Sequence, residues 1–448
     1  MRIRLPRGDA GGNSEVAVIV AIYPDGSVEE YAGFLADDGT PYLGNMDTIR
    51  TDGNPPKIAG DLRDGSARYA VANESTPYNY DEFTSDDRWA NDYIDHIFAV
   101  QILELTPDGP QKITNVFDPM YGAQSDLVVG KIRTGGVVFL SNGNLLVGAE
   151  DRSLEGASPK APNISIIDGE TGEIIHGPIH VLGTGEYDFW EGLAAFNGGF
   201  AVRVGNGGVV DGNATTIIKF YDNDGNELGS WLQKSDPALQ PLDFSDNPEG
   251  FTTSITTTGR GDGNGLASHI NSNYVYYAGQ GPDPLTGAGA DFVYVTKIDA
   301  TTMQSVDEVL VPEQIFNGEE YDNNAGVNRV FVTVDENDNV FVGWSDIRNT
   351  GTAQIQGRFY DSELEPVTET FLVFQNSDPG DGTFPLPGIV PSTFHGAGAM
   401  DTERLVVAAR TTGYVIPGET DPLPNNTNIF TVLRSPFAGQ DVRSWDLF

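Results

Sequence analysis

Short runs rich in Val, Ile, Phe, Tyr and Thr, bounded by Gly, Asn, Asp and Pro, recur along the whole chain and pair into hairpins of two alternating kinds. Hairpins of the first kind are apolar, as in residues 136–148 (GVVFLSNGNLLVG). Hairpins of the second kind are more polar, as in residues 217–231 (IIKFYDNDGNELGSW). Because no segment carries a long 3.6-residue apolar period, the chain is predicted to be all-β.

The hairpin turns contain residues that suit tight turns. Asn-Gly and Asp-Gly pairs permit the positive φ angles that two-residue hairpins need. The apolar hairpins turn at Asp64-Gly65, Asn142-Gly143, Asn197-Gly198, Ser272-Asn273, Asn337-Asp338 and Thr402-Glu403. The polar hairpins turn at Asp25-Gly26, Asp108-Gly109, Asp168-Gly169, Asp224-Gly225, Asp299-Ala300 and Asp361-Ser362.

The spacing of these turns predicts the architecture. The apolar turns fall near residues 65, 142, 197, 272, 337 and 402, so the unit recurs at intervals of 55 to 77 residues. One buried hairpin plus one outer hairpin makes a four-stranded propeller blade. A parallel β-helix repeats at shorter intervals and would not alternate two hairpin kinds. Two packed β-sandwiches are the other alternative.

Six apolar hairpins predict a single β-propeller of six four-stranded blades. The N-terminal hairpin, residues 15–34, is of the outer kind and has no inner partner before it, so we expect it to close the ring with residues 405–410 and 429–433. Such closure hides free sheet edges. If the hairpin forms a separate blade, the count is seven. The predicted domains are an N-terminal arm, residues 1–13, and the propeller, residues 14–448.

One blade carries a family resemblance. The run 339–349 (NVFVGWSDIRN) followed by 355–361 (IQGRFYD) resembles the Trp-x-Asp-x-Arg propeller repeats of bacterial extracellular and cell-surface proteins. Residues 149–152 (AEDR) and Ala409-Arg410 are partial echoes that lack the Trp. The resemblance implies a secreted or surface-displayed propeller. It implies no activity, because that family serves adhesion, scaffolding and sugar chemistry.

The charge of the chain excludes several partners. There are 65 acidic against 25 basic residues, for a net charge of −40. Binding to nucleic acid or anionic membranes relies on Lys and Arg, so neither is expected. The acidic surface suits a salty medium, and divalent cations such as Ca²⁺ would relieve its self-repulsion. The apolar run at residues 16–23 is eight residues long and follows Glu15, so it is interpreted as a strand and not as a signal peptide core or membrane span.

Candidate ligand-binding residues precede the inner hairpins. In a propeller the loop that enters each innermost strand lies beside the central channel, so these residues are expected to converge on one mouth. They are Trp190, Glu191, Arg260, Asp262, Asn328, Arg329 and His395. If the mouth is catalytic, Glu191 with Asp262 would supply the carboxylates for sugar hydrolysis. His395 with Arg260 or Arg329 would supply the base and cation for elimination from a uronate.

Other motifs give weaker signals. Asp222, Asp224 and Asn226 have the oxygen density of a calcium loop, but their spacing is not that of an EF-hand and an ordinary hairpin is the alternative. His176 and His180 are interpreted as polar positions on an outer hairpin. His269 is interpreted as a core histidine. Asn-x-Ser/Thr triplets begin at Asn73, Asn163, Asn213 and Asn425. The sequence contains no cysteine and no nucleotide or redox cofactor motif.

Together these features predict an extracellular, non-catalytic propeller that acts as an interaction or structural module on a cell surface, filament or virion. Its partner would be a carbohydrate or a surface protein, and the N-terminal arm would offer a route to self-assembly. The alternative is a polysaccharide-active enzyme, a lyase or hydrolase, with its site at the channel mouth.

Overall fold

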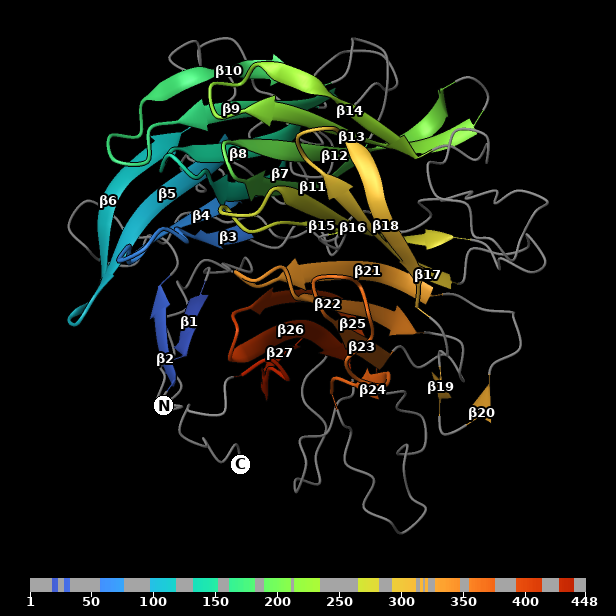
Figure 1. The fold of residues 1–448 in the computed structure, drawn as a ribbon. Coiled ribbons are helices and arrows are strands. Elements are labelled where there is room, and N and C mark those ends of the chain that lie inside the picture. The colour runs from blue at the N-terminus through green and yellow to red at the C-terminus, as the bar shows by residue number, and fades with distance from the viewer. Residues whose placement is uncertain are drawn as a thin grey trace, which may run out of the picture.

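The computed structural model describes residues 18–22, 28–32, 57–75, 97–117, 132–151, 161–181, 189–210, 213–233, 265–281, 292–311, 315–316, 319–320, 327–346, 354–374, 392–412 and 427–438. Every regular element among them is a β-strand (Figure 1). This confirms the all-β prediction. The described part of the chain also has no helix long and apolar enough to cross a membrane.

Six antiparallel sheets follow one another along the chain, and each is one blade. Blade 1 contains β3 (Lys57–Gly60), β4 (Arg68–Ser75), β5 (Ile97–Thr106) and β6 (Gly109–Phe117). Blade 2 contains β7 (Ile132–Phe139), β8 (Leu145–Asp151), β9 (Ala161–Ile167) and β10 (Ile174–His180). Blade 3 contains β11 (Phe189–Phe196), β12 (Gly199–Val210), β13 (Asn213–Asp222) and β14 (Glu227–Gln233).

The remaining blades repeat the pattern. Blade 4 contains β15 (Leu266–Ala267), β16 (Tyr274–Gly281), β17 (Phe292–Asp299) and β18 (Gln304–Leu310). Blade 5 contains β21 (Val327–Val334), β22 (Val340–Asp346), β23 (Gln354–Tyr360) and β24 (Phe371–Leu372). Blade 6 contains β25 (Ser392–Met400), β26 (Arg404–Thr412) and β27 (Thr427–Arg434). A minor pair, β19 (Ile315–Phe316) and β20 (Glu319–Glu320), lies between blades 4 and 5 in the sequence.

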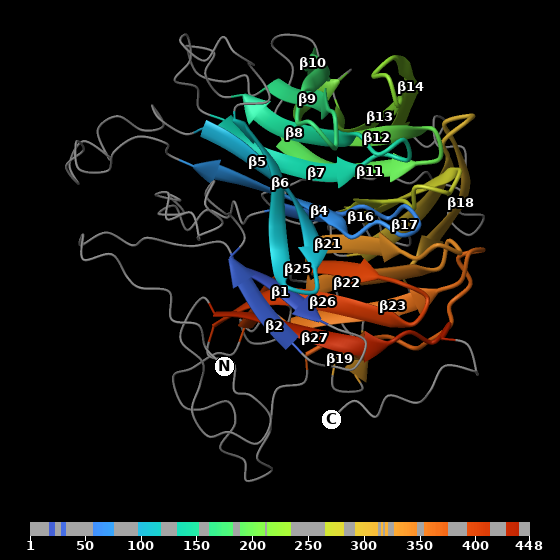
Figure 2. The ribbon, with the colours of Figure 1, turned by 90° about the vertical axis from the view of Figure 1, so that its left-hand side faces the viewer.

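The six blades form a propeller, as the sequence predicts. The N-terminal hairpin, β1 (Val18–Ile22) and β2 (Val28–Ala32), is a two-stranded sheet among the described pairings. It lies beside blade 6, at its junction with blade 1 (Figures 1 and 2). Blade 6 shows three strands of its own in the described residues, so the hairpin lies on the side where the ring must close. The predicted N-terminal arm, residues 1–13, falls outside the described residues.

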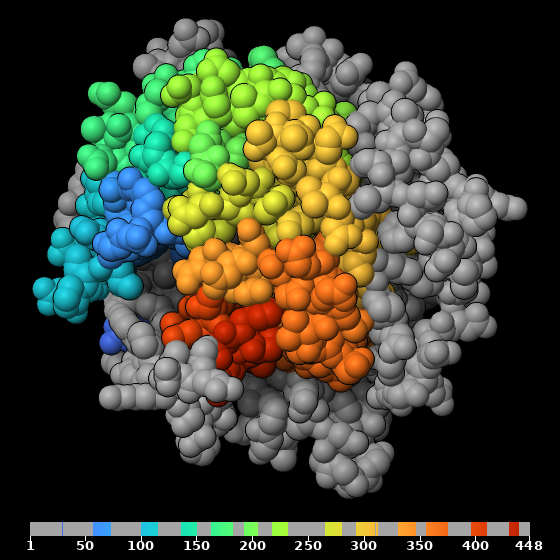
Figure 3. Space-filling model, viewed as in Figure 1, coloured from blue at the N-terminus to red at the C-terminus, as the bar shows by residue number. Residues whose placement is uncertain are grey.

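Each predicted turn lies between two consecutive strands of the structure. Apolar hairpins are the first and second strands of each blade, and polar hairpins are the third and fourth strands or β1 and β2. Because the strands alternate in direction, all these blade turns lie at one end of the ring, which we call the turn end. The first strands point toward it in Figure 2, and Figure 3 shows it from the front. The opposite end, where the first strands begin, we call the bulge end.

The core consists of five apolar clusters, one between each pair of consecutive blades from 1 to 6. The cluster between blades 4 and 5 contains Trp344, the Trp of the Trp-x-Asp-x-Arg run, which is fully buried. Each buried large side chain contributes about 1.5–3 kcal/mol. Stability therefore comes from stacking neighbouring blades, since a single blade cannot cover both of its faces.

Candidate functional site

Hairpin turns at the turn end are capped by their own acidic residues. The Oδ1 atom of Asp222 accepts the backbone N–H groups of Asp224 (3.0 Å) and Asn226 (2.8 Å), and Oδ2 accepts Nδ2 of Asn226 (2.8 Å). Asp335 makes the same three bonds to Asn337 and Asn339, at 2.8, 2.9 and 2.8 Å. Side-chain oxygens of four further aspartates cap turns in this way, namely Asp168, Asp299, Asp361 and Asp401. These aspartates stabilise their own hairpin turns by accepting hydrogen bonds from backbone amides.

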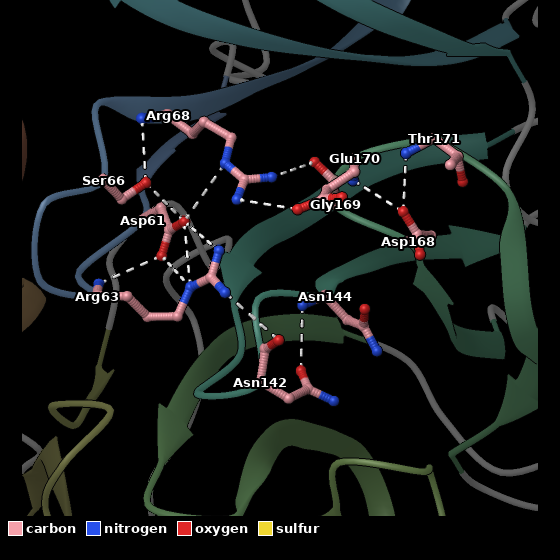
Figure 4. Close-up of polar contacts among 10 residues, drawn as sticks. All are labelled: Asp61, Arg63, Ser66, Arg68, Asn142, Asn144, Asp168, Gly169, Glu170 and Thr171. Atoms are coloured by element: carbon pink, nitrogen blue, oxygen red, sulfur yellow. Dashed lines mark hydrogen bonds and ion pairs between the residues drawn. The ribbon is translucent and has the colours of Figure 1, made fainter.

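A polar cluster joins blades 1 and 2 at the turn end (Figure 4). The buried carboxylate of Asp61 accepts Nε (2.9 Å) and Nη2 (2.7 Å) of Arg63 and Oγ of Ser66 (2.7 Å). Burial alone would raise the pKa of Asp61, but these hydrogen bonds hold it below its usual value. Arg68 reaches blade 2, where Nη1 donates to the Gly169 carbonyl at 3.1 Å. Arg63 and Arg68 are therefore both part of the polar contact between blades 1 and 2.

Similar bonds continue around the turn end. Ser141 Oγ of blade 2 accepts the Gly198 N–H of blade 3 at 3.2 Å. The Asn197 N–H of blade 3 donates to the Ser272 carbonyl of blade 4 at 2.8 Å. Lys297 Nζ of blade 4 donates to the Ser362 carbonyl of blade 5 at 2.6 Å. Hydrogen bonds at the turn end thus link each of these blades to the next.

The bulge end is built differently. Four of the innermost strands contain a β-bulge near their first residues, and each bulge places one more residue on the innermost strand than on its partner. The extra residues are Gly135 in β7, Glu191 in β11, Arg329–Val330 opposite one residue in β21, and His395–Gly396 opposite one residue in β25. Bulges concentrate at barrel rims and beside binding sites, where they redirect side chains.

The structure places the predicted ligand residues with respect to these bulges. Trp190 and Glu191 lie at the bulge of β11, Asn328 and Arg329 at that of β21, and His395 in that of β25. The strands β21 and β25 are neighbours, so Arg329 and His395 lie at one joint, whereas β11 belongs to blade 3. Arg260 and Asp262 lie outside the described residues, and a binding or catalytic role for any of these residues stays a prediction.

Glycines allow blades 5 and 6 to pack closely beside the bulges. The Phe331 ring of β21 is fully buried and lies against Gly343 of its own blade and Gly396 and Gly398 of blade 6. A Cβ atom at Gly396 would clash with this ring and with Cδ1 of Ile355 at 3.0 Å. The bulge of β25 is therefore held directly against the end of the bulge of β21.

Sequence reasoning missed the bulges and the arginines on the second strands. Arg203, across from Gly192 in blade 3, is buried and its guanidinium lies 4.8 Å from the centre of the Tyr277 ring. Arg410 lies across from Phe394, the residue before His395. A signal was present, because Gly follows the bulge position in Gly135-Gly136, Glu191-Gly192 and His395-Gly396. Glycine inside a strand often marks a bulge.

The predicted calcium turn is an ordinary hairpin in geometry. Hydrogen bonds from Asn226 and Asp224 offset the effect of burial and lower the pKa of Asp222. The described residues contain no group of three or more His, Asp or Glu side chains arranged to hold a metal ion. A Ca²⁺ ion at Asp222 would replace hydrogen bonds that the turn already makes, and calcium binding stays a prediction.

The remaining sequence motifs have structural surroundings. His176 and His180 lie on β10, the outer strand of blade 2, as predicted, and Nδ1 of His180 is hydrogen-bonded to Oδ1 of Asn163 at 2.5 Å. Asn163 is buried, so this triplet is unsuitable for glycosylation in the folded protein. His269, as predicted, is buried, and its Nδ1 accepts the Asn271 N–H at 3.3 Å.

An acidic joint lies between blades 4 and 5 at the turn end. Asp338 has a positive φ of 64° and a buried Oδ1 atom without a hydrogen-bond partner. Burial raises the pKa of Asp338, although a hydrogen bond from Ser272 and the charge of Lys297 act against this. Burial lowers the pKa of His269, although Glu336, Asp338 and Asp335 act against it.

Comparisons with known proteins found only distant matches among solved structures. No family model and no curated protein matches the chain. A protein of unknown function from Dyadobacter fermentans DSM 18053 is 11% identical, with a TM-score of 0.45, over 85% of this chain and 94% of that one. The β-propeller domain of the Trilobed protease from Pyrococcus furiosus is 8% identical, with a TM-score of 0.40, over 95% and 92%. The α-L-arabinofuranosidase PaAbf62A from Podospora anserina is 11% identical, with a TM-score of 0.35, over 88% and 94%. No activity, ligand or partner follows from likeness at this level.

Proposed function

We propose that this β-propeller is a non-catalytic interaction module whose partner binds at the bulge end. The main support is the row of bulges in β7, β11, β21 and β25, which recur at one end of the innermost strands. A bulge breaks the regular ladder and changes the direction of a side chain, and bulges are frequent both at barrel rims and beside active sites. Trp190, Glu191, Asn328, Arg329 and His395 supply polar and aromatic groups there.

The turn end is less suited to a partner. Its aspartates accept the amides of their own turns, as at Asp222 and Asp335, and several of its other polar groups join neighbouring blades. A ligand would have to displace these hydrogen bonds before it could bind to the same groups.

The proposed setting is extracellular, on a cell surface, filament or virion, and the proposed partner is a carbohydrate or a surface protein. The net charge of −40 and the resemblance of residues 339–361 to surface-displayed repeats support this setting. The catalytic alternative stays open, because Asp262, the proposed partner of Glu191 in sugar hydrolysis, lies outside the described residues.

The test is a binding screen of the whole chain against cell-surface polysaccharides and surface-protein extracts, with variants at both ends. Glu191→Gln and Asn328→Ala at the bulge end are expected to weaken the interaction at least about tenfold. The control Glu403→Gln, in a turn of blade 6, should leave it unchanged. Equal loss in the control would overturn the assignment of the bulge end. Release of shortened or unsaturated sugars would contradict the non-catalytic module and support the polysaccharide-active enzyme.

A further inference from the structure

Blades 5 and 6 present an uneven set of charges at the bulge end. Arg329 lies in the bulge of β21 and His395 in the bulge of β25. Arg410 of β26 lies across from Phe394 of β25, and Phe394 is the residue before the bulge. Because the Phe331 ring packs on Gly396, these two bulges lie at a single tight joint. Three residues that are positively charged, or can become so, therefore share one rim segment in a protein with a charge of −40.

The other side of the ring differs. In blade 2, Arg133 lies directly across from Glu150. In blade 3, Glu191 lies in the bulge beside the register pair of Gly192 and Arg203. Each of these arginines has an acidic residue at or next to its register position, as cross-strand charge pairs require.

In blades 5 and 6 the register positions are neutral. The pair that flanks Arg329 is Asn328 with Ser345, and the partner of Arg410 is Phe394. The acidic residue at this end of β22 is Asp346, which pairs with Val327. Among the described strand pairings at these two bulges, one acidic residue therefore accompanies two arginines and a histidine.

We propose that this segment, Arg329, His395 and Arg410, binds the carboxylate of an acidic sugar, so that the carbohydrate partner is a uronate-bearing glycan. The inference rests on the proposed function, because it names the ligand class of the same bulge end. Arginine matches a carboxylate through two parallel N–H donors, and the pair is stronger than a neutral hydrogen bond. Histidine adds a donor in either protonation state.

The net charge of the protein narrows the ligand further. A field from −40 charges repels a dense polyanion, so nucleic acid or a heavily sulfated chain would be disfavoured over most of its length. A glycan with one carboxylate for each sugar residue or fewer requires a positive segment only where its anionic group docks. The proposal is therefore a local anionic subsite within an acidic protein.

The experiment is calorimetric titration of the full chain with short oligogalacturonates and with the same oligomers after reduction of their carboxylates to alcohols. We expect the reduced oligomers to bind at least about tenfold more weakly. Arg329→Gln and Arg410→Gln should each weaken oligogalacturonate binding by a similar factor and leave binding of the reduced oligomer unchanged. Arg329→Lys, which keeps the charge and loses the paired donors, should fall between the native chain and Arg329→Gln.

The matched control is Arg404→Gln, which makes the same change on the same strand, β26, at the turn end. It should bind like the native chain, and melting temperatures will show whether any variant has lost its fold. Equal affinity for both oligomers, or no affinity for the carboxylated one, would overturn the carboxylate subsite. The proposed function would survive either result if Glu191→Gln still weakened binding of another partner, and would fail if that variant changed no interaction.

Discussion

The turn end and the bulge end of the ring use polar residues in different ways. At the turn end, carboxylates such as those of Asp222 and Asp335 accept backbone amides from their own turns. At the bulge end, Glu191, Arg329 and His395 stand where the regular ladder is interrupted. The difference shows that several aspartates serve local turn geometry. Net charge alone therefore does not locate a ligand site, and the position of a charge along its strand says more.

The largest expected effect comes from filling a glycine at the bulge end. Gly396→Val should lower the free energy of unfolding by about 3 kcal/mol, because the new side chain has no room beside Phe331. Urea denaturation would measure the loss. Gly60→Val is the matched control, since a Cβ atom there would meet nothing within 4 Å. Recovery of stability on adding Phe331→Leu would locate the clash, and equal stability of the two valine variants would contradict it.

The second effect removes a cap at the turn end. Asp335→Ala should lower the free energy of unfolding by about 2 kcal/mol, because it deletes three hydrogen bonds from a side chain in a residue that is 1% exposed. Chemical denaturation of Glu336→Ala, the exposed neighbour in the same turn, provides the comparison and should show less than about 0.5 kcal/mol. Similar values for both would mean that the turn does not depend on its cap.

The turn end could be predicted from sequence because its determinants are local. Asn142-Gly143 and Asp108-Gly109 each specify a turn through conformations that few other residues adopt. The recurrence of such pairs then predicts the order of the strands and six blades, with seven as the alternative if the N-terminal hairpin forms a separate blade. Strand pairing within a blade follows from chain order, so the fold needed no information from distant residues.

The bulge end could be predicted only in part. That Glu191, Arg329 and His395 precede inner hairpins follows from chain order. Their positions within bulges depend on contacts between blades, such as Phe331 with Gly396, which are remote in sequence. Arg203 illustrates the same limit, since its burial against Tyr277 joins blades 3 and 4. Such contacts leave no periodic signal in one sequence.

The third prediction concerns pH at the joint between blades 4 and 5. Burial lowers the pKa of His269 below its ordinary value of 6.5. As the pH falls, His269 is therefore protonated in the unfolded chain before it is protonated in the folded chain, which favours unfolding. Stability should therefore decline as the pH drops below about 6.5, by less than the loss at Asp335. Melting temperatures between about pH 7 and pH 5 should fall less steeply for His269→Gln. Equal slopes would show that His269 does not contribute.

The smallest expected effect is a gain in the free energy of unfolding. It tests whether every carboxylate at the turn end stabilises the fold. Burial raises the pKa of Asp338, whose Oδ1 atom has no partner, so its charge costs stability above the folded-state pKa. Asp338→Asn should raise the free energy of unfolding at neutral pH by about 0.5 kcal/mol, since Asn also accepts a positive φ. The gain should shrink as the pH falls towards 3.8 and vanish below it, where the Asp338 carboxyl is protonated in both the folded and the unfolded state. Asp64→Asn, an exposed turn residue of blade 1, is the control. A loss of stability in Asp338→Asn alone would mean that the attraction of Lys297 for the Asp338 carboxylate outweighs the cost of burial, and that this carboxylate too is a stabilising part of the turn end.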